Sequence, residues 1–169
     1  MIWSKLKKAV EAHLADAVKE HLQLHLTRYG PGVSYIMNRA WITWDGEEIS
    51  TFATIGWIQA HRALSAHIGE NDEQRSQAEI SEQASDLLEQ RGLYTRDDFY
   101  DALEEYSSLS IEKALQSPNT IIKALTMFDK RLGKRRLLAM RSVAIDHPLV
   151  QHYYQLRCTV EGIPVSGAE

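Results

Sequence analysis

The densest group of side chains that could do chemistry in this 169-residue chain is a basic run in its C-terminal third. The run consists of Lys130, Arg131, Lys134, Arg135, Arg136 and Arg141. On a helix, several of these residues fall on one side, where lysine and arginine can neutralise phosphates and release bound counterions. The run therefore indicates one candidate binding face, either for a protein of opposite charge or for nucleic acid.

An acidic stretch precedes the basic run and indicates a second candidate face. Residues 70–112 contain 13 acidic and three basic side chains, a net charge of −10, whereas residues 113–157 have a net charge of +7. The acidic residues that we assign to this face are Asp86, Glu89, Asp97, Asp101, Glu104 and Glu105. Such a surface can imitate a phosphate backbone or accelerate the encounter with a basic partner. The alternative for both faces is solvation, or pairing inside the molecule.

Histidine and cysteine spacings do not indicate a metal or catalytic centre. The seven histidines form no His-Glu-x-x-His, and the single cysteine excludes Cys-x-x-Cys. Cys158 follows His152 by six residues, which places them roughly 200° apart around a helix. Phosphate loops and serine nucleophile elbows are missing as well. We therefore expect no catalytic residue, no metal and no cofactor, with a small hydrolase of scattered site residues as an alternative.

The composition of the chain is ordinary, with 44% hydrophobic and 25% charged residues. The length suits one domain of roughly 100–200 residues, so we expect a single α+β domain over residues 1–164 and a tail over 165–169. No secretory signal and no stretch of about 18 apolar residues is present. These features predict a cytoplasmic protein that does not enter a membrane; they leave its oligomeric state open.

Apolar periodicity in the first third of the chain predicts one helix followed by three strands. A three- and four-residue period runs over residues 3–20, and a two-residue period begins at Leu22. A second strand is expected over residues 34–44 and a third over 48–54. Between them stands Asp45-Gly46, the strongest hairpin signal in the chain. The three strands together predict an antiparallel meander.

Helices are expected throughout the rest of the chain. The first follows an apolar stripe from Trp57 to Ile68, the second ends at Gly92, and the third begins after an N-cap at Thr95. A fourth begins at Ser117-Pro118, a fifth covers residues 134–144, and the last runs from Asp146-His147-Pro148 to Gly162. Strands grouped before helices favour α+β over α/β, because a parallel sheet needs alternation. We expect an N-terminal helix, a three-stranded antiparallel sheet, and five or six helices packed on it.

Three distinctive segments, spread over nearly the whole chain, carry a family resemblance. They are residues 3–8, residues 122–137 with the core Phe128-Asp129-Lys130-Arg131-Leu132-Gly133-Lys134-Arg135-Arg136-Leu137, and residues 147–162. In these segments the chain resembles an uncharacterised family of small bacterial cytoplasmic proteins. The resemblance implies one domain. That family has no assigned activity, so the resemblance implies no functional residues.

The charge separation and the lack of catalytic motifs favour a non-enzymatic protein-binding module of adaptor, regulatory or immunity type. In that role one charged face would meet a partner protein of opposite sign. The alternative hypothesis is that the protein binds nucleic acid through the basic segment 130–141. The binding hypothesis requires that the two faces do not neutralise each other inside the molecule.

Overall fold

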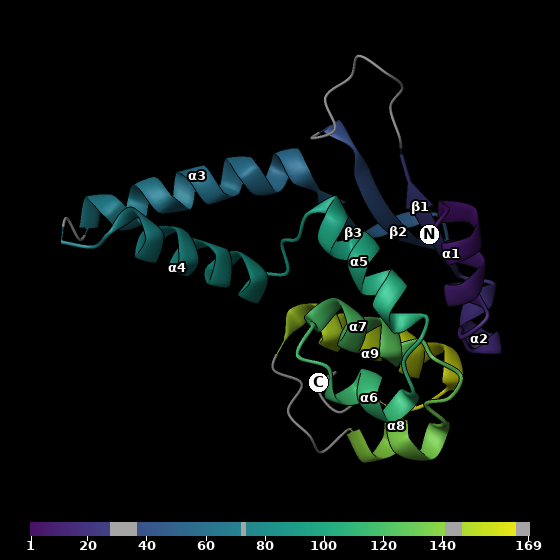
Figure 1. Cartoon of the computed structure of the whole chain (residues 1–169). Coiled ribbons are helices and arrows are strands. Elements are labelled where there is room, and N and C mark those ends of the chain that lie inside the picture. Colours follow the sequence, from purple (N-terminus) through teal and green to yellow (C-terminus); the bar gives the residue numbers. More distant parts are fainter. Residues whose placement is uncertain (28–36, 72–73, 141–146, 165–169) are drawn as a thin grey trace.

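A computed structural model describes residues 1–27, 37–71, 74–140 and 147–164 (Figure 1). Its first elements are α1 (Trp3–Glu11), α2 (Asp16–Lys19), β1 (Leu22–Leu26), β2 (Arg39–Trp44) and β3 (Glu47–Ala53). Its later helices are α3 (Thr54–Asn71), α4 (Gln77–Gln90), α5 (Arg96–Tyr106), α6 (Ile111–Gln116), α7 (Thr120–Met127), α8 (Lys134–Met140) and α9 (Pro148–Glu161). The predicted α+β order is confirmed, with seven helices after the sheet in the described ranges. The short α6 is the one that the apolar pattern did not predict.

The sheet is the predicted antiparallel meander, with the strand order β1-β2-β3. Ile42 in the central strand lies between Leu24 and Ser50. The two-residue turn has positive φ at both positions, 51° at Asp45 and 84° at Gly46, as a type I′ hairpin requires. The hairpin signal is therefore confirmed. Residues 34–36 of the predicted second strand lie outside the described residues.

One face of the sheet packs against helices and forms the core. The Phe52 ring of β3 stacks on Phe99 of α5, with 4.2 Å between the centroids. Phe128, at the end of α7, stacks on Trp44 of β2 and also on Tyr153 of α9. Both groups of rings belong to one hydrophobic core, in which the sheet, α5 and α9 meet.

The helix predicted over residues 3–20 is interrupted, because residues 13–15 pair with a distant segment. The Ala15 amide donates to the Phe128 carbonyl at 2.9 Å, and the Lys130 amide donates to the His13 carbonyl at 2.8 Å. Between them Leu14 forms a β-bridge with Asp129. Backbone groups used in this way cannot also continue a helix, so α1 ends at Glu11 and α2 begins at Asp16.

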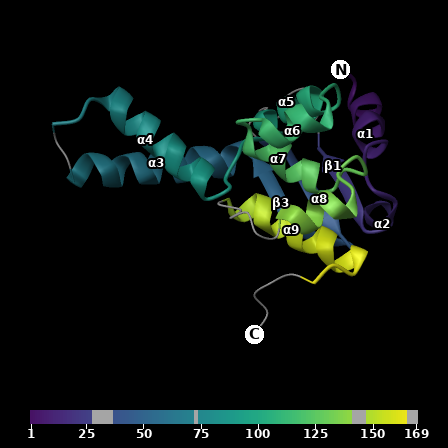
Figure 2. The same ribbon diagram turned by 90° about the horizontal axis from the view of Figure 1, so that it is seen from below.

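Helices α3 and α4 form a hairpin that projects from the rest of the molecule, here called the arm (Figures 1 and 2). We expected these helices to cover the sheet. Within α3 only Thr54 is buried, while α4 buries Ile80, Ala84 and Leu88. Over the described residues, the main core cluster includes no side chain of either helix. The arm is therefore held by the packing of α3 on α4, by its chain connections, and by a hydrogen bond of 2.7 Å from the His147 Nε2 to the Glu89 carbonyl.

The start of α7 is set by Asn119 and not by the predicted Ser117-Pro118. The Asn119 Oδ1 accepts from the backbone amides of Ile121 at 2.9 Å and Ile122 at 3.2 Å. These two bonds satisfy donors that a helix N-terminus otherwise leaves without partners.

Replacement of this cap tests its contribution to stability. We expect Asn119→Ala to lower the free energy of unfolding by about 1 kcal/mol, because both amides lose their acceptor. Asn119→Ser, whose hydroxyl can accept the same bonds, retains most of the stability. Urea unfolding of the two variants and the wild type measures the difference. An Asn119→Ala midpoint equal to that of the wild type would contradict the assignment.

Candidate functional site

The basic run lies in the turn after α7 and in α8, and Arg131 is part of a buried ion pair. Asp129 has no exposed surface, and its Oδ2 lies 2.6 Å from the Arg131 Nη2. The Arg131 Nε lies 3.0 Å from both carboxylate oxygens, and the Tyr106 hydroxyl donates to Oδ2 at 2.6 Å. Arg131 also donates from Nη1 to the Leu109 carbonyl at 2.7 Å. This side chain is therefore committed to the fold.

The protonation states within this cluster follow from burial and hydrogen bonding. Burial alone would raise the pKa of Asp129, but the hydrogen bonds from Arg131 and Tyr106 outweigh it and hold that pKa below its ordinary value. Burial, together with the Asp129 charge, raises the pKa of the Tyr106 hydroxyl. Tyr106 therefore remains a proton donor to a charged carboxylate.

Two further members of the basic run also have acidic partners in the same chain. The Lys134 Nζ lies 2.9 Å from the Glu161 Oε2, and the Arg136 Nη2 lies 3.2 Å from the Glu112 Oε1. Lys130 and Arg135 are exposed, and their side chains make no ion pair within the described ranges. Arg141 lies outside those ranges. Half of the predicted basic face is therefore neutralised locally.

Fewer of the predicted acidic residues form ion pairs than of the predicted basic residues. Glu104 pairs with the N-terminal amine of Met1, and Asp97 pairs with Arg96. The other four are exposed, and their side chains form no ion pair or hydrogen bond in the described part of the chain. We call these four residues the open carboxylates: Asp86, Glu89, Asp101 and Glu105.

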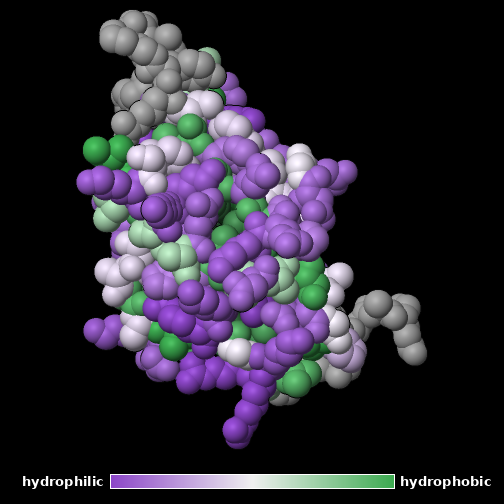
Figure 3. Space-filling view, turned by 90° about the vertical axis from the view of Figure 1, so that its right-hand side faces the viewer, coloured by the Kyte–Doolittle hydropathy of each residue, from purple (hydrophilic) through white to green (hydrophobic). Residues whose placement is uncertain are grey.

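The two predicted faces do not neutralise each other. Among the ion pairs of the described residues, the basic run uses Asp129, Glu112 and Glu161 as partners, and none of these belongs to the predicted acidic face. The open carboxylates are carried in two places, on α4 of the arm and on α5 of the body. Figure 3 shows the face of the molecule opposite the arm, where most surface residues are hydrophilic and the apolar residues are scattered.

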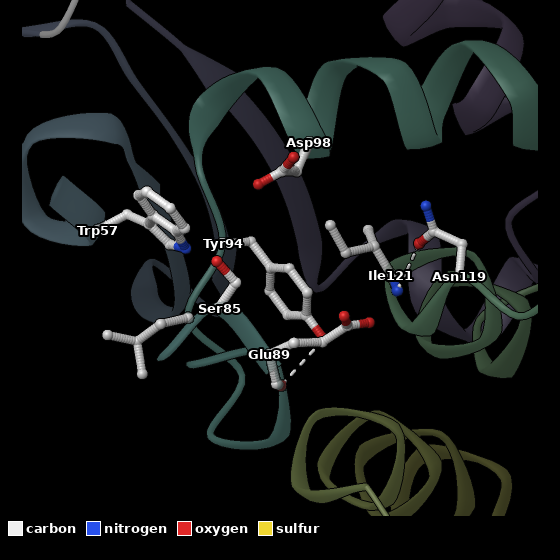
Figure 4. A pocket seen from close by; sticks show the side chains of 8 residues that line it. Trp57, Ser85, Glu89, Tyr94, Asp98, Asn119 and Ile121 are labelled. Carbon is white, nitrogen blue, oxygen red and sulfur yellow. Dashed lines mark hydrogen bonds between the residues drawn. The ribbon is translucent and has the colours of Figure 1, made fainter. Parts of the chain in front are cut away.

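A cavity of about 280 Å³ lies where the arm meets the body, and we call it the junction cavity (Figure 4). Its lining residues are Trp57, Ser85, Glu89, Leu93, Tyr94, Asp98, Asn119 and Ile121. They come from α3, α4, α5, the segment between α4 and α5, and the start of α7. Of these residues, Glu89 is the one that the charge pattern of the sequence indicates as a site residue. No periodic signal links the others, because they meet only through the fold.

The lining of the junction cavity combines two carboxylates with two aromatic rings and has no basic side chain. The Tyr94 hydroxyl donates to the Glu89 carbonyl at 3.3 Å, and burial raises the pKa of Tyr94 to about 12. The Asp98 Oδ2 accepts from the amide and the hydroxyl of Thr95, each at 2.7 Å. The Trp57 ring stacks on His61, with centroids 4.7 Å apart. The two rings and the Asp98 carboxylate are thus held in place, whereas the Glu89 carboxylate has no partner among the described residues. This lining is suited to recognise a cation.

Cys158 and the metal-ligating side chains were the other candidates for chemistry. Cys158 is fully buried, and burial raises the pKa of its thiol, which disfavours the reactive thiolate. No group of three or more histidine, cysteine, aspartate or glutamate side chains in the described ranges is placed to hold a metal ion. Over the same ranges, no helix has the length and apolarity needed to cross a bilayer.

Comparison with known proteins gives one match. The profile of the SF0329 protein family matches residues 2–158, which include the turn at Asp129 and the whole lining of the junction cavity. No curated protein and no solved structure matches the chain.

Removal of the buried charge tests the structural role of the turn. We expect Asp129→Asn to lower the free energy of unfolding by about 3 kcal/mol, because Arg131 loses its buried counter-charge. The matched variant Arg136→Gln breaks an exposed pair and costs less than about 1 kcal/mol. Urea unfolding at neutral pH compares the two. Equal losses would show that the Asp129 pair stabilises no more than a surface pair.

The same pair makes a predictable contribution to the pH dependence of stability. The pKa of the Asp129 carboxylate is lower in the folded protein than in the unfolded chain. As the pH falls, the carboxylate is therefore protonated in the unfolded chain before it is protonated in the folded protein. The stabilisation is therefore complete at neutral pH and is lost below the ordinary pKa, near pH 4. We expect the stability difference between the wild type and Asp129→Asn to narrow between about pH 4 and pH 3. A difference that stays constant over this range in urea unfolding would contradict the lowered pKa.

Proposed function

The chain belongs to the SF0329 protein family, and from that starting point we propose that it is a non-enzymatic protein-binding module that engages a basic partner. The open carboxylates of α4 and α5 supply the attraction. An adaptor, regulatory or immunity role in a bacterial cytoplasm is part of the same proposal.

The observation that carries this proposal is the unequal engagement of the two charged groups. Arg131, Lys134 and Arg136 have acidic partners within the chain, whereas the four open carboxylates have none in the described part. Carboxylates without counter-charges attract an oppositely charged surface and raise the rate at which it is encountered. Over the described residues, three of the five predicted basic residues are ion-paired but only two of the six predicted acidic ones, so the acidic face is the less neutralised of the two.

The arm adds apolar surface close to these charges. Along α3 the large side chains of Trp57, Ile58 and Leu64 are only partly buried. A groove of about 490 Å³ runs along the arm, lined by Ala60, Ala63, Leu64, His67, Leu88, Arg91 and Leu93. Apolar surface rimmed by charge is typical of protein–protein interfaces. A partner that carries both apolar and basic side chains fits this combination.

Variants of the full chain can test the proposal by affinity capture from extracts of the native host. The acidic variant combines Asp86→Asn, Glu89→Gln, Asp101→Asn and Glu105→Gln. The matched basic variant combines Lys113→Gln, Lys123→Gln, Lys130→Gln and Arg135→Gln, whose side chains form no ion pair in the described ranges. We expect the acidic variant to lose partner proteins by about tenfold, which is about 1.4 kcal/mol, and the basic variant to retain them. Capture weakens as salt rises.

Two outcomes would count against the proposal. Partners that both variants retain equally would show that the open carboxylates do not bind them. Nucleic acid that the wild type captures at low salt and the basic variant loses would favour the nucleic-acid alternative, which on this structure depends on Lys130 and Arg135.

A further inference from the structure

We propose that the junction cavity receives an arginine side chain presented by the partner, an inference that rests on the proposed function and names its point of recognition. The cavity joins the two helices that carry the open carboxylates, because Glu89 belongs to α4 and Asp98 lies in the first turn of α5. A basic partner attracted to both groups would therefore reach this cavity between them.

The carboxylates of the cavity suit a guanidinium. Glu89 has no side-chain partner among the described residues, and Asp98 directs one oxygen to Thr95, which leaves acceptor capacity on the other. Figure 4 shows the Asp98 carboxylate facing the space beside Trp57 and Tyr94. A guanidinium has five donors in a planar fork and can bond carboxylates on two edges at once. With no basic side chain in the lining, nothing within the cavity already neutralises this pair.

The aromatic rings distinguish arginine from other cations. Trp57 and Tyr94 bound the cavity, and a guanidinium within about 6 Å of either ring face gains a cation–π attraction. Its flat shape also stacks on aromatic faces, which the rounder ammonium of lysine does less well. Leu93 and Ile121 provide apolar surface for the methylene stem.

The size of the cavity supports a side chain as the occupant. Pockets for drug-sized ligands span about 300–1,000 Å³, and the junction cavity, at about 280 Å³, lies just below that range. One arginine side chain entering from a docked surface fits within this space.

The experiment follows the indole N–H of Trp57 in the ¹⁵N-labelled full chain, with its signal identified by Trp57→Phe. The probe is arginine blocked as its N-acetyl N′-methyl amide, compared with lysine and norleucine blocked in the same way. We expect a saturable shift with arginine, a weaker effect with lysine and none with norleucine. Glu89→Gln should weaken arginine binding about fivefold, whereas Glu82→Gln, which removes the same charge from α4 outside the lining, should not.

Several results would overturn this inference. They are the absence of a saturable shift, an equal response to norleucine or lysine, or an equal loss in Glu82→Gln. Agmatine that binds tenfold more tightly than blocked arginine would show a small-molecule site instead of a docking site. If capture depends on the open carboxylates and the titration fails, the cavity assignment is wrong and the proposed function stands. If blocked arginine binds and the acidic variant captures partner proteins as well as the wild type does, the guanidinium site stands and the proposed function is wrong.

Discussion

The Asp129 carboxylate is the constraint on which much of the body depends. Removing such a charge from water costs several kcal/mol unless it is paired and fully hydrogen-bonded. Arg131 and Tyr106 satisfy it, and in doing so they fix the turn after α7 against the end of α5. That turn places Phe128 between Trp44 and Tyr153, so one ion pair determines where the sheet and α9 meet.

Local signals in the sequence predicted much of the fold correctly. Asp45-Gly46 forms the hairpin, Thr95 and Asp98 form a capping box, and Gly162 ends α9 in the left-handed conformation. These signals work because the energy of a turn or a cap depends on a few adjacent residues. The break after Glu11 was not predictable in this way, since it follows from pairing with residues 128–130. The position of the arm was missed for a similar reason, because an apolar stripe does not specify which surface covers it.

The candidate site shows the same division. The sequence located the charged residues, but it could not distinguish a charge that stabilises the fold from one that remains free. Lys134 and Arg135 are neighbours of equal charge, yet Lys134 pairs with Glu161 and Arg135 has no ion pair in the described ranges. The junction cavity was beyond prediction because Trp57 and Asp98 belong to elements that approach only in three dimensions. The sequence therefore predicted two charged stretches of opposite sign, and the geometry shows which of their described residues are paired within the fold.

The backbone pairing of residues 13–15 with residues 128–130 also imposes an order on biosynthesis. More than 110 residues separate the two segments, so the N-terminal helices are synthesised long before their pairing partner exists. Until then the Ala15 amide and the His13 carbonyl have no native backbone partner and must be solvated. Closure of the body is therefore a late event in synthesis, because a nascent chain that ends before the turn cannot yet form this pairing.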